Sequence, residues 1–207
     1  MGPAMISQLL PPISSMLATK LIAGFGTAAV AAWALGSRFE FFVIVPVLAL
    51  TMSMPPMIGR LLGAKKLVEV RQLISIASRF VILSQLVIAV LAFMGASSLA
   101  QLLSGEESVA NILSWHLMLV PISLGALGLC MVMVSVSNAI GRSYTALTIS
   151  ALRLFAFFLP CIWLGSEIGG LQGVFVGVLV GNLLAGLCAW VVCQKALRRV
   201  EAETQAN

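Results

Sequence analysis

The fold is decided by residues 27–54, which read TAAVAAWALGSRFEFFVIVPVLALTMSM. This stretch is longer than the roughly 20 apolar residues that a helix needs to cross a bilayer. Only two of its residues are ionisable, Arg38 and Glu40. A charge near the bilayer centre costs roughly 2.5–3.5 kcal/mol even on insertion scales, so membrane helices that keep one commonly use it to bind a substrate, an ion or a proton. The stretch predicts a membrane helix that carries a functional site.

The composition extends this prediction to the whole chain. Of the 207 residues, 60% are hydrophobic and only 9% are charged, which excludes a water-soluble domain of ordinary size. We expect an all-α, polytopic membrane protein, with residues 1–200 forming one bundle of six transmembrane helices and residues 201–207 forming a polar cytoplasmic tail. The expected spans are 3–22, 27–62, 74–103, 112–136, 147–164 and 171–192.

Basic residues gather in alternate connections between the expected spans. Eight of the twelve Lys and Arg residues lie in them, at the adjoining end of the second span or after the last span: Arg60, Lys65, Lys66, Arg71, Arg142, Lys195, Arg198 and Arg199. The other connections carry Glu106, Glu107 and Glu167 and contain no Lys or Arg. The positive-inside rule then places both termini in the cytoplasm. This distribution explains the net charge of +5 without nucleic acid as a partner.

Glu40 is the only acidic residue expected at membrane depth. It follows Thr27 by thirteen residues, or about 20 Å along a helix, which is close to the middle of the bilayer. A carboxylate there can hold a proton, Na⁺ or a cationic substrate. The alternative is a structural ion pair with Arg38 or Arg153, although residues two apart on a helix do not face each other. For Arg153 we expect a structural or snorkelling role.

Neutral polar residues add further candidates. Gln8 and Asn138 carry amides that are costly to bury, so they are candidates for lining a substrate or ion pathway. His116 has neither an acid nor a second His at ligand spacing in its own span, and we expect it to be an interfacial histidine. No HExxH, GxSxG or phosphate-binding glycine motif is present. We therefore expect no enzyme activity, no metal site and no cofactor other than a coupling ion, H⁺ or Na⁺.

Four glycines follow one another in steps of four, at Gly169, Gly173, Gly177 and Gly181. Residues four apart lie on one face of a helix, and glycine lets a second backbone approach closely. The stripe predicts that another helix docks there.

Three stretches together resemble the multidrug and toxic compound extrusion (MATE) transporters. They are 24–40 (GFGTAAVAAWALGSRFE), 56–64 (PMIGRLLGA, similar to the family's P-x-x-G-Q-x-x-G-A) and 138–142 (NAIGR), the last followed by Leu152, Arg153 and Pro160. Their order matches the C-terminal half of the family. Arg60 stands where the family pattern has glutamine.

The resemblance implies one lobe of a transporter that has two lobes of six helices and a substrate cavity between them. Such transporters exchange H⁺ or Na⁺ for organic cations and amphipathic drugs by alternating access. Glu40 would take the place of a family carboxylate and Arg38 that of its accompanying arginine. The first and fourth spans lack the acidic residues of many family members, so Glu40 is the only carboxylate candidate.

On this reading the chain is a truncated or split lobe in a bacterial inner membrane. Its partners would be the bilayer, organic cations or amphipathic drugs, and either the missing N-terminal lobe or a second copy of itself. Two alternatives remain. One is a non-transporting remnant or assembly subunit whose charges are structural, and the other is a lipid-linked precursor flippase of the same superfamily.

Overall fold

The computed structural model describes the backbone of residues 2–206 and the side chains of Leu9 and of residues 12–199. The described chain is helical and contains no strand, in agreement with the all-α prediction. Its elements are α1 (Gly2–Ala23), α2 (Thr27–Gly63), α3 (Leu67–Leu103), α4 (Glu107–Ala139), α5 (Ser143–Ala151), the π-helix η1 (Leu152–Phe158) and α6 (Leu159–Ala206).

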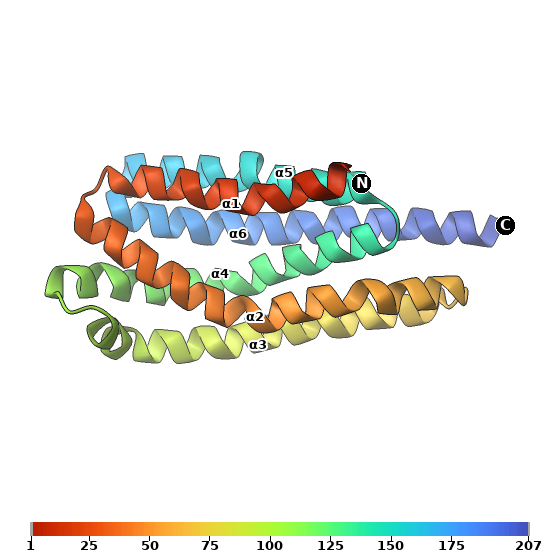
Figure 1. The fold of residues 1–207 in the computed structure, drawn as a ribbon, viewed down its shortest axis with the longest axis horizontal. Helices are drawn as coiled ribbons and strands as arrows, with labels where there is room; N and C mark the ends of the chain where they lie inside the picture. Colours follow the sequence, from red (N-terminus) through yellow and green to blue (C-terminus); the bar gives the residue numbers. More distant parts are fainter. Residues whose placement is uncertain (1, 207) are drawn as a thin grey trace.

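The helices lie side by side along the long axis of the molecule, with α2 and α3 on one side and α1, α5 and α6 on the other (Figure 1). Between them runs α4, which packs on α2, α3 and α6 and has the longest set of buried residues of any single helix. Both termini lie toward the same end of the bundle. The connections around Lys65 and Arg142 lie at that end, and Glu106 and Glu167 lie at the other.

The chain reverses direction inside α6. Gly169 and Gly170 have non-helical backbone angles there, and Gly170 has a positive φ of 55°. Beyond this break the chain packs back against the helix that precedes it. A Cβ atom added at Gly173 would overlap the carbonyl group of Gly165, and one added at Gly177 would overlap that of Cys161.

The glycine stripe therefore docks on a neighbouring helix, as predicted, through Gly173, Gly177 and Gly181. Gly169 was wrongly included in the stripe. It lies at the turn. Apart from its neighbours in the chain and the local helix backbone, no atom comes within 4 Å of a Cβ placed there.

The expected count of six separate membrane helices is not confirmed. Within the described residues, four helices are long and apolar enough to cross a membrane: Thr27–Gly63, Leu67–Leu103, Glu107–Ala139 and Ser143–Arg199. The expected spans 147–164 and 171–192 both fall in the last of these, since only two glycines interrupt its helical backbone. The expected span 3–22 is not among the four.

The third helix begins earlier than residue 74, where its span was expected to start. Helix α3 starts at Leu67 because the basic segment before residue 74 is itself helical and amphipathic. Lys66 Nζ lies 2.8 Å from Glu69 Oε1, one helical turn further on, while Val70 is buried in the core. The first turn of α3 thus combines a surface ion pair with a buried apolar contact.

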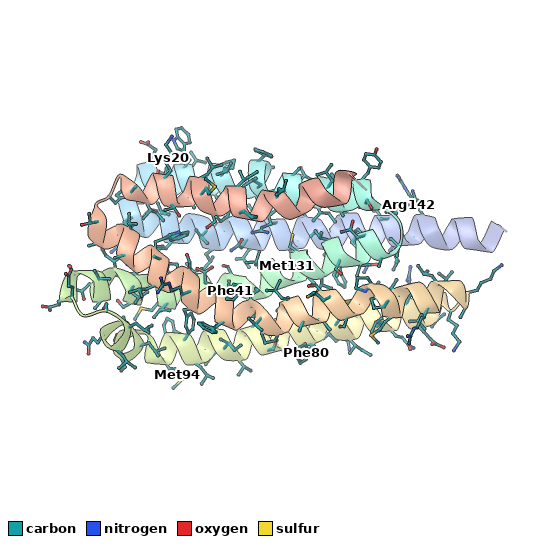
Figure 2. The ribbon with its side chains drawn as sticks, viewed as in Figure 1. Lys20, Phe41, Phe80, Met94, Met131 and Arg142 are labelled. Carbon is teal, nitrogen blue, oxygen red and sulfur yellow. The ribbon has the colours of Figure 1, made fainter. Side chains whose placement is uncertain are left out.

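The outer face of α3 is strongly apolar. Phe80 and Met94 point away from the bundle (Figure 2) and are 52% and 79% exposed. Lys20 and Arg142 lie toward opposite ends of the molecule. A broad apolar belt between polar ends is what a multi-pass membrane protein presents to lipid.

Candidate substrate and coupling site

Glu40 on α2 and His116 on α4 form a direct side-chain pair. Glu40 Oε1 lies 2.7 Å from His116 Nε2, although the two residues are 76 positions apart in the sequence. The His116 side chain is 0% exposed and that of Glu40 is 24% exposed. A neutral imidazole donates its Nε2–H to a carboxylate, and an imidazolium forms a charge-assisted hydrogen bond. In either case a hydrogen bond joins the two side chains.

Two aromatic rings enclose the imidazole of His116. Trp33 contacts it edge-on with ring centroids 5.3 Å apart, and Phe175 does so at 5.2 Å. Gly36 leaves the remaining space for the ring, since a Cβ atom at this position would lie 2.8 Å from His116 Cε1. His116 Nδ1 is buried and has no hydrogen-bond partner. The aromatic enclosure aims Nε2 at Glu40 and isolates the other nitrogen.

The expectation that His116 is an interfacial histidine was wrong. Its acid partner comes from a different helix, so a search for an acid at short spacing within the same span could not find it. One signal was available: both Glu40 and His116 are ionisable residues inside apolar segments, and such residues commonly pair with one another.

Glu40 lines a cavity of about 330 Å³. Apolar and aromatic side chains, among them Trp33, Phe41 and Phe158, form much of its wall. Its polar lining consists of Ser14, Ser15, Ser37, Glu40, Arg153 and Asn182. Apolar walls with a few convergent polar groups are characteristic of small-molecule binding sites.

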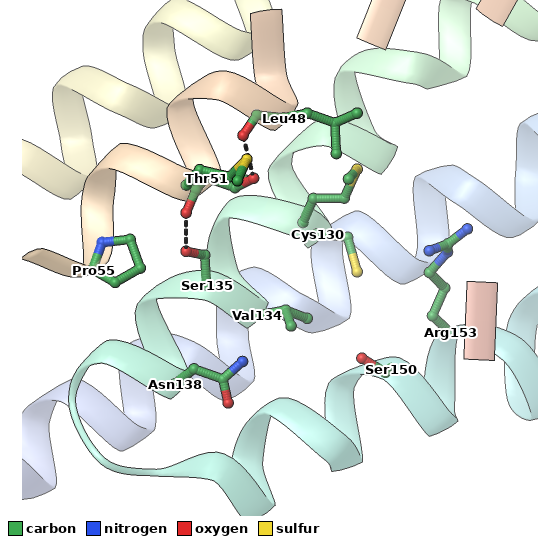
Figure 3. Close-up of a pocket in the computed structure, with 11 residues that line it drawn as sticks. Leu48, Thr51, Pro55, Cys130, Val134, Ser135, Asn138, Ser150 and Arg153 are labelled. Carbon is green, nitrogen blue, oxygen red and sulfur yellow. Dashed lines mark hydrogen bonds between the residues drawn. The ribbon is translucent and has the colours of Figure 1, made fainter. Parts of the chain in front are cut away.

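A second cavity of about 470 Å³ lies between α2, α4 and α5 (Figure 3). Ser135 on α4 donates a hydrogen bond of 2.7 Å to the carbonyl oxygen of Thr51 on α2, which joins two walls of the cavity. Its polar lining consists of Thr51, Ser135, Asn138, Ser150 and Arg153, and no acidic residue lines it.

Arg153 lines both cavities. It lies in the π-helix η1, which ends at Phe158, two residues before Pro160. Proline lacks the N–H that would close an ordinary helical hydrogen bond, and the wider turn accommodates this loss. No hydrogen bond or ion pair joins Arg153 to Glu40 or to any other described residue. Among the described residues, Glu40 therefore forms no ion pair with Arg153 or with Arg38.

The remaining predicted site residues lie at different places. Asn138 lines the 470 Å³ cavity, and its buried Oδ1 has no hydrogen-bond partner. Arg38 is exposed on α2 and lines neither cavity. The side chain of Gln8 lies outside the described residues. The structure thus brings Glu40 and Arg153 to one cavity and Asn138 and Arg153 to the other.

Asn182 was missed by the sequence analysis. It is buried in α6, donates a hydrogen bond of 3.0 Å from Nδ2 to Ser123 Oγ, and lines the cavity that contains Glu40. Its buried Oδ1 has no partner. The available signal was an amide within the apolar run 171–192, which is as costly to bury as those of Gln8 and Asn138.

The MatE family model matches residues 3–164 of this chain. The chain is 29% identical over 202 residues to a Shewanella oneidensis protein named FAD transporter, covering 98% of this chain and 45% of that protein. A crystal structure of the Vibrio cholerae MATE transporter VcmN, in the bent form, is 64% identical, with a TM-score of 0.94. That match covers 98% of this chain and 46% of VcmN.

The fold is also similar to that of a MOP superfamily transporter from Pyrococcus furiosus, at 18% identity and a TM-score of 0.89, with 96% of this chain and 45% of that chain covered. The chain thus spans just under half the length of the relatives it matches. These matches confirm the resemblance to MATE transporters and to a single lobe. A transporter family is also consistent with the expected lack of enzyme activity.

Proposed function

Since the chain belongs to the MATE family of multi-pass membrane transporters, we propose that it forms the C-terminal lobe of a cation-coupled efflux antiporter. The Glu40–His116 pair carries this proposal, because it places an exchangeable proton at the wall of a cavity that has apolar and aromatic sides. The substrates would be organic cations or amphipathic drugs.

Coupling follows from competition for one carboxylate. With Glu40 ionised, His116 Nε2–H donates to it and a cationic substrate in the cavity is attracted to the same group. A proton that binds the pair neutralises it and removes this attraction. Proton and substrate then occupy the site in turn, which is the condition for exchange. We favour H⁺ over Na⁺ because the described cavity walls offer one carboxylate, and Na⁺ would need several oxygen ligands around it.

Alternating access requires a second wall. The matched relatives contain a further half that this chain does not cover, and that half would supply the second wall. We propose that the partner is either a separate N-terminal lobe or a second copy of this chain. The basic end of the bundle, which holds both termini, would face the cytoplasm of a bacterial inner membrane.

A second candidate is transport of a flavin nucleotide. It is supported by the Shewanella oneidensis relative named FAD transporter and by Arg153, a cation on the cavity wall without a described partner. An anionic, aromatic substrate would be received by Arg153, whereas an organic cation would be received by Glu40. The two candidates share the fold and differ in which charged residue receives the substrate.

The test measures efflux from cells that produce this chain alone or together with the part of VcmN outside the match. Both kinds of cells are assayed with the wild-type chain, with the Glu40→Gln variant and with the control variant Glu167→Gln, which changes an exposed acid. Ethidium efflux lost only in Glu40→Gln would support the first candidate. Release of FAD without ethidium efflux would support the second. Neither activity, with both polypeptides present in the membrane, would overturn both and favour a non-transporting subunit.

A further inference from the structure

Arg153 lies well inside the candidate membrane span Ser143–Arg199. It follows Ser143, the first residue of α5, by ten positions, or about 15 Å, which is half the thickness of a typical hydrocarbon core. Long basic side chains snorkel to the interface from positions near helix ends. A residue in the middle of a span does not have this option, so its charge must be compensated locally.

The described protein does not supply that compensation. Arg153 has no hydrogen bond or ion pair with another described residue. The one carboxylate in the neighbouring cavity wall, Glu40, is held by His116 at 2.7 Å. The larger cavity has no acidic lining residue at all. Arg153 is therefore the only charged side chain described on the wall of the 470 Å³ cavity, and an anion is the species that this wall attracts.

The surroundings of Arg153 offer polar groups on one side and aromatic rings on the other, the two parts of a site for an amphipathic anion. Ser150 lies one turn before it, and Asn138 faces the same cavity across from α5 (Figure 3), so hydroxyl and amide groups accompany the guanidinium. In the other direction the 330 Å³ cavity presents the rings of Trp33 and Phe41. A planar guanidinium binds phosphate or carboxylate through two parallel hydrogen bonds, and the adjoining aromatic wall suits a flat ring.

We propose that Arg153 binds the phosphate or carboxylate group of an amphipathic anion at the junction of the two cavities. The inference rests on the second candidate of the proposed function, in which these cavities receive an anionic molecule. It adds that the molecule carries a negative group next to an apolar or aromatic body. The same chemistry is shared by a soluble phosphate ester and by an anionic phospholipid headgroup.

The probes are riboflavin and riboflavin 5′-phosphate, which have the same ring and differ in one phosphate. Their binding to the purified full chain in phosphatidylcholine nanodiscs is followed by fluorescence polarisation. We expect the phosphate form to bind about tenfold more tightly or better, since charge-assisted bidentate contacts exceed neutral ones. Arg153→Gln should remove this preference and leave riboflavin binding unchanged. The matched control is Arg79→Gln, an exposed arginine that lines neither cavity.

The source of the anion is resolved by repeating the measurement in nanodiscs that contain phosphatidylglycerol. If a lipid headgroup occupies the site, phosphatidylglycerol lowers the affinity for the phosphate probe, and native mass spectrometry finds this lipid retained by the wild type and lost from Arg153→Gln. If phosphatidylglycerol has no effect on a preference that depends on Arg153, the anion is a soluble phosphate ester.

Thermal unfolding separates binding from a structural role. Without ligand, Arg153→Gln should unfold at the same or a higher temperature than the wild type, because it removes an uncompensated charge. Should it fail to fold, Arg153→Lys keeps the charge without the planar fork and should show a reduced phosphate preference. Absence of any phosphate preference together with no retained phosphatidylglycerol, or a preference that survives in Arg153→Gln, would overturn the proposal. This assay measures binding without a proton gradient, so loss of coupling in the efflux experiment is distinguishable from failure of anion binding.

Discussion

Gly36 and His116 occupy facing positions on α2 and α4 so closely that a single methyl group on Gly36 would overlap the imidazole ring. The absence of a side chain at residue 36 is thus what admits the histidine to the bundle interior. Through this contact a glycine in the second helix determines where the partner of Glu40 lies.

We predict that Gly36→Ala costs about 1–3 kcal/mol of unfolding free energy, the usual range for overpacking a core. Titration with a denaturing detergent measures it in micelles. The matched control is Gly59→Ala on the same helix, where no atom beyond the neighbouring residues and the local helix backbone lies within 4 Å of the added methyl group. That change should be neutral or stabilise by up to about 1 kcal/mol, because alanine favours helix more than glycine does. Equal destabilisation by both would refute the steric account.

A double-mutant cycle should detect the Glu40–His116 hydrogen bond. We expect Glu40→Gln and His116→Phe to show a coupling energy of about 1.5–3 kcal/mol in unfolding experiments, since a hydrogen bond to a charged group contributes in this range. The control cycle combines Glu40→Gln with Ser135→Ala. Ser135 bonds to Thr51, eleven residues beyond Glu40 on α2, or about 16 Å away. Coupling of similar size in the control cycle would mean that the two changes act through global destabilisation.

The close approach of the two arms of the Ser143–Ala206 segment depends on individual glycines. Gly177→Ala should lower the unfolding free energy by about 1–3 kcal/mol, because the new methyl group meets the Cys161 carbonyl group of the opposite arm. Gly169→Ala serves as the comparison, since its surroundings are empty and its φ of −128° suits alanine. The same denaturation assay measures both, and a harmless Gly177→Ala would show that the arms separate easily.

The Ser123–Asn182 hydrogen bond should stabilise the packing of α4 on α6. Ser123→Ala leaves Asn182 Nδ2 buried without its described partner, which should cost about 1–3 kcal/mol. Replacing both residues, with Ser123→Ala and Asn182→Leu, should cost less than the two single changes together. Ser166→Ala removes a hydroxyl that bonds only within its own helix near the surface, and it should change stability by less than about 0.5 kcal/mol.

The sequence was informative wherever one residue is unusual for its own segment. Glu40 could be selected because no other acid occurs in the expected spans, and it does line a cavity. The spacing of Gly173, Gly177 and Gly181 revealed a docking face because helical periodicity is local. The composition sufficed for the helical class.

Features that depend on three-dimensional pairing could not be read in this way. His116 has its acid on another helix, and no spacing rule within α4 points to it. Arg153 was assigned a snorkelling or structural role, since the sequence does not show that it borders two cavities. The turn at Gly169–Gly170 lies between the expected spans 147–164 and 171–192, but the sequence did not show that helical backbone continues directly on either side of it.

The charge of the Glu40–His116 pair has a consequence for the response of the protein to membrane voltage. With neutral imidazole and ionised carboxylate, the Glu40–His116 pair carries one negative charge, and it becomes neutral when it takes up either a proton or a monovalent cation. Moving one elementary charge through the full potential involves about 2.3 kcal/mol per 100 mV. On the proposed mechanism, both loaded forms would reorient without working against the field, whereas the empty form would experience it. Membrane voltage would then change how readily the empty transporter reorients, and it would leave the exchange of proton for substrate unaffected.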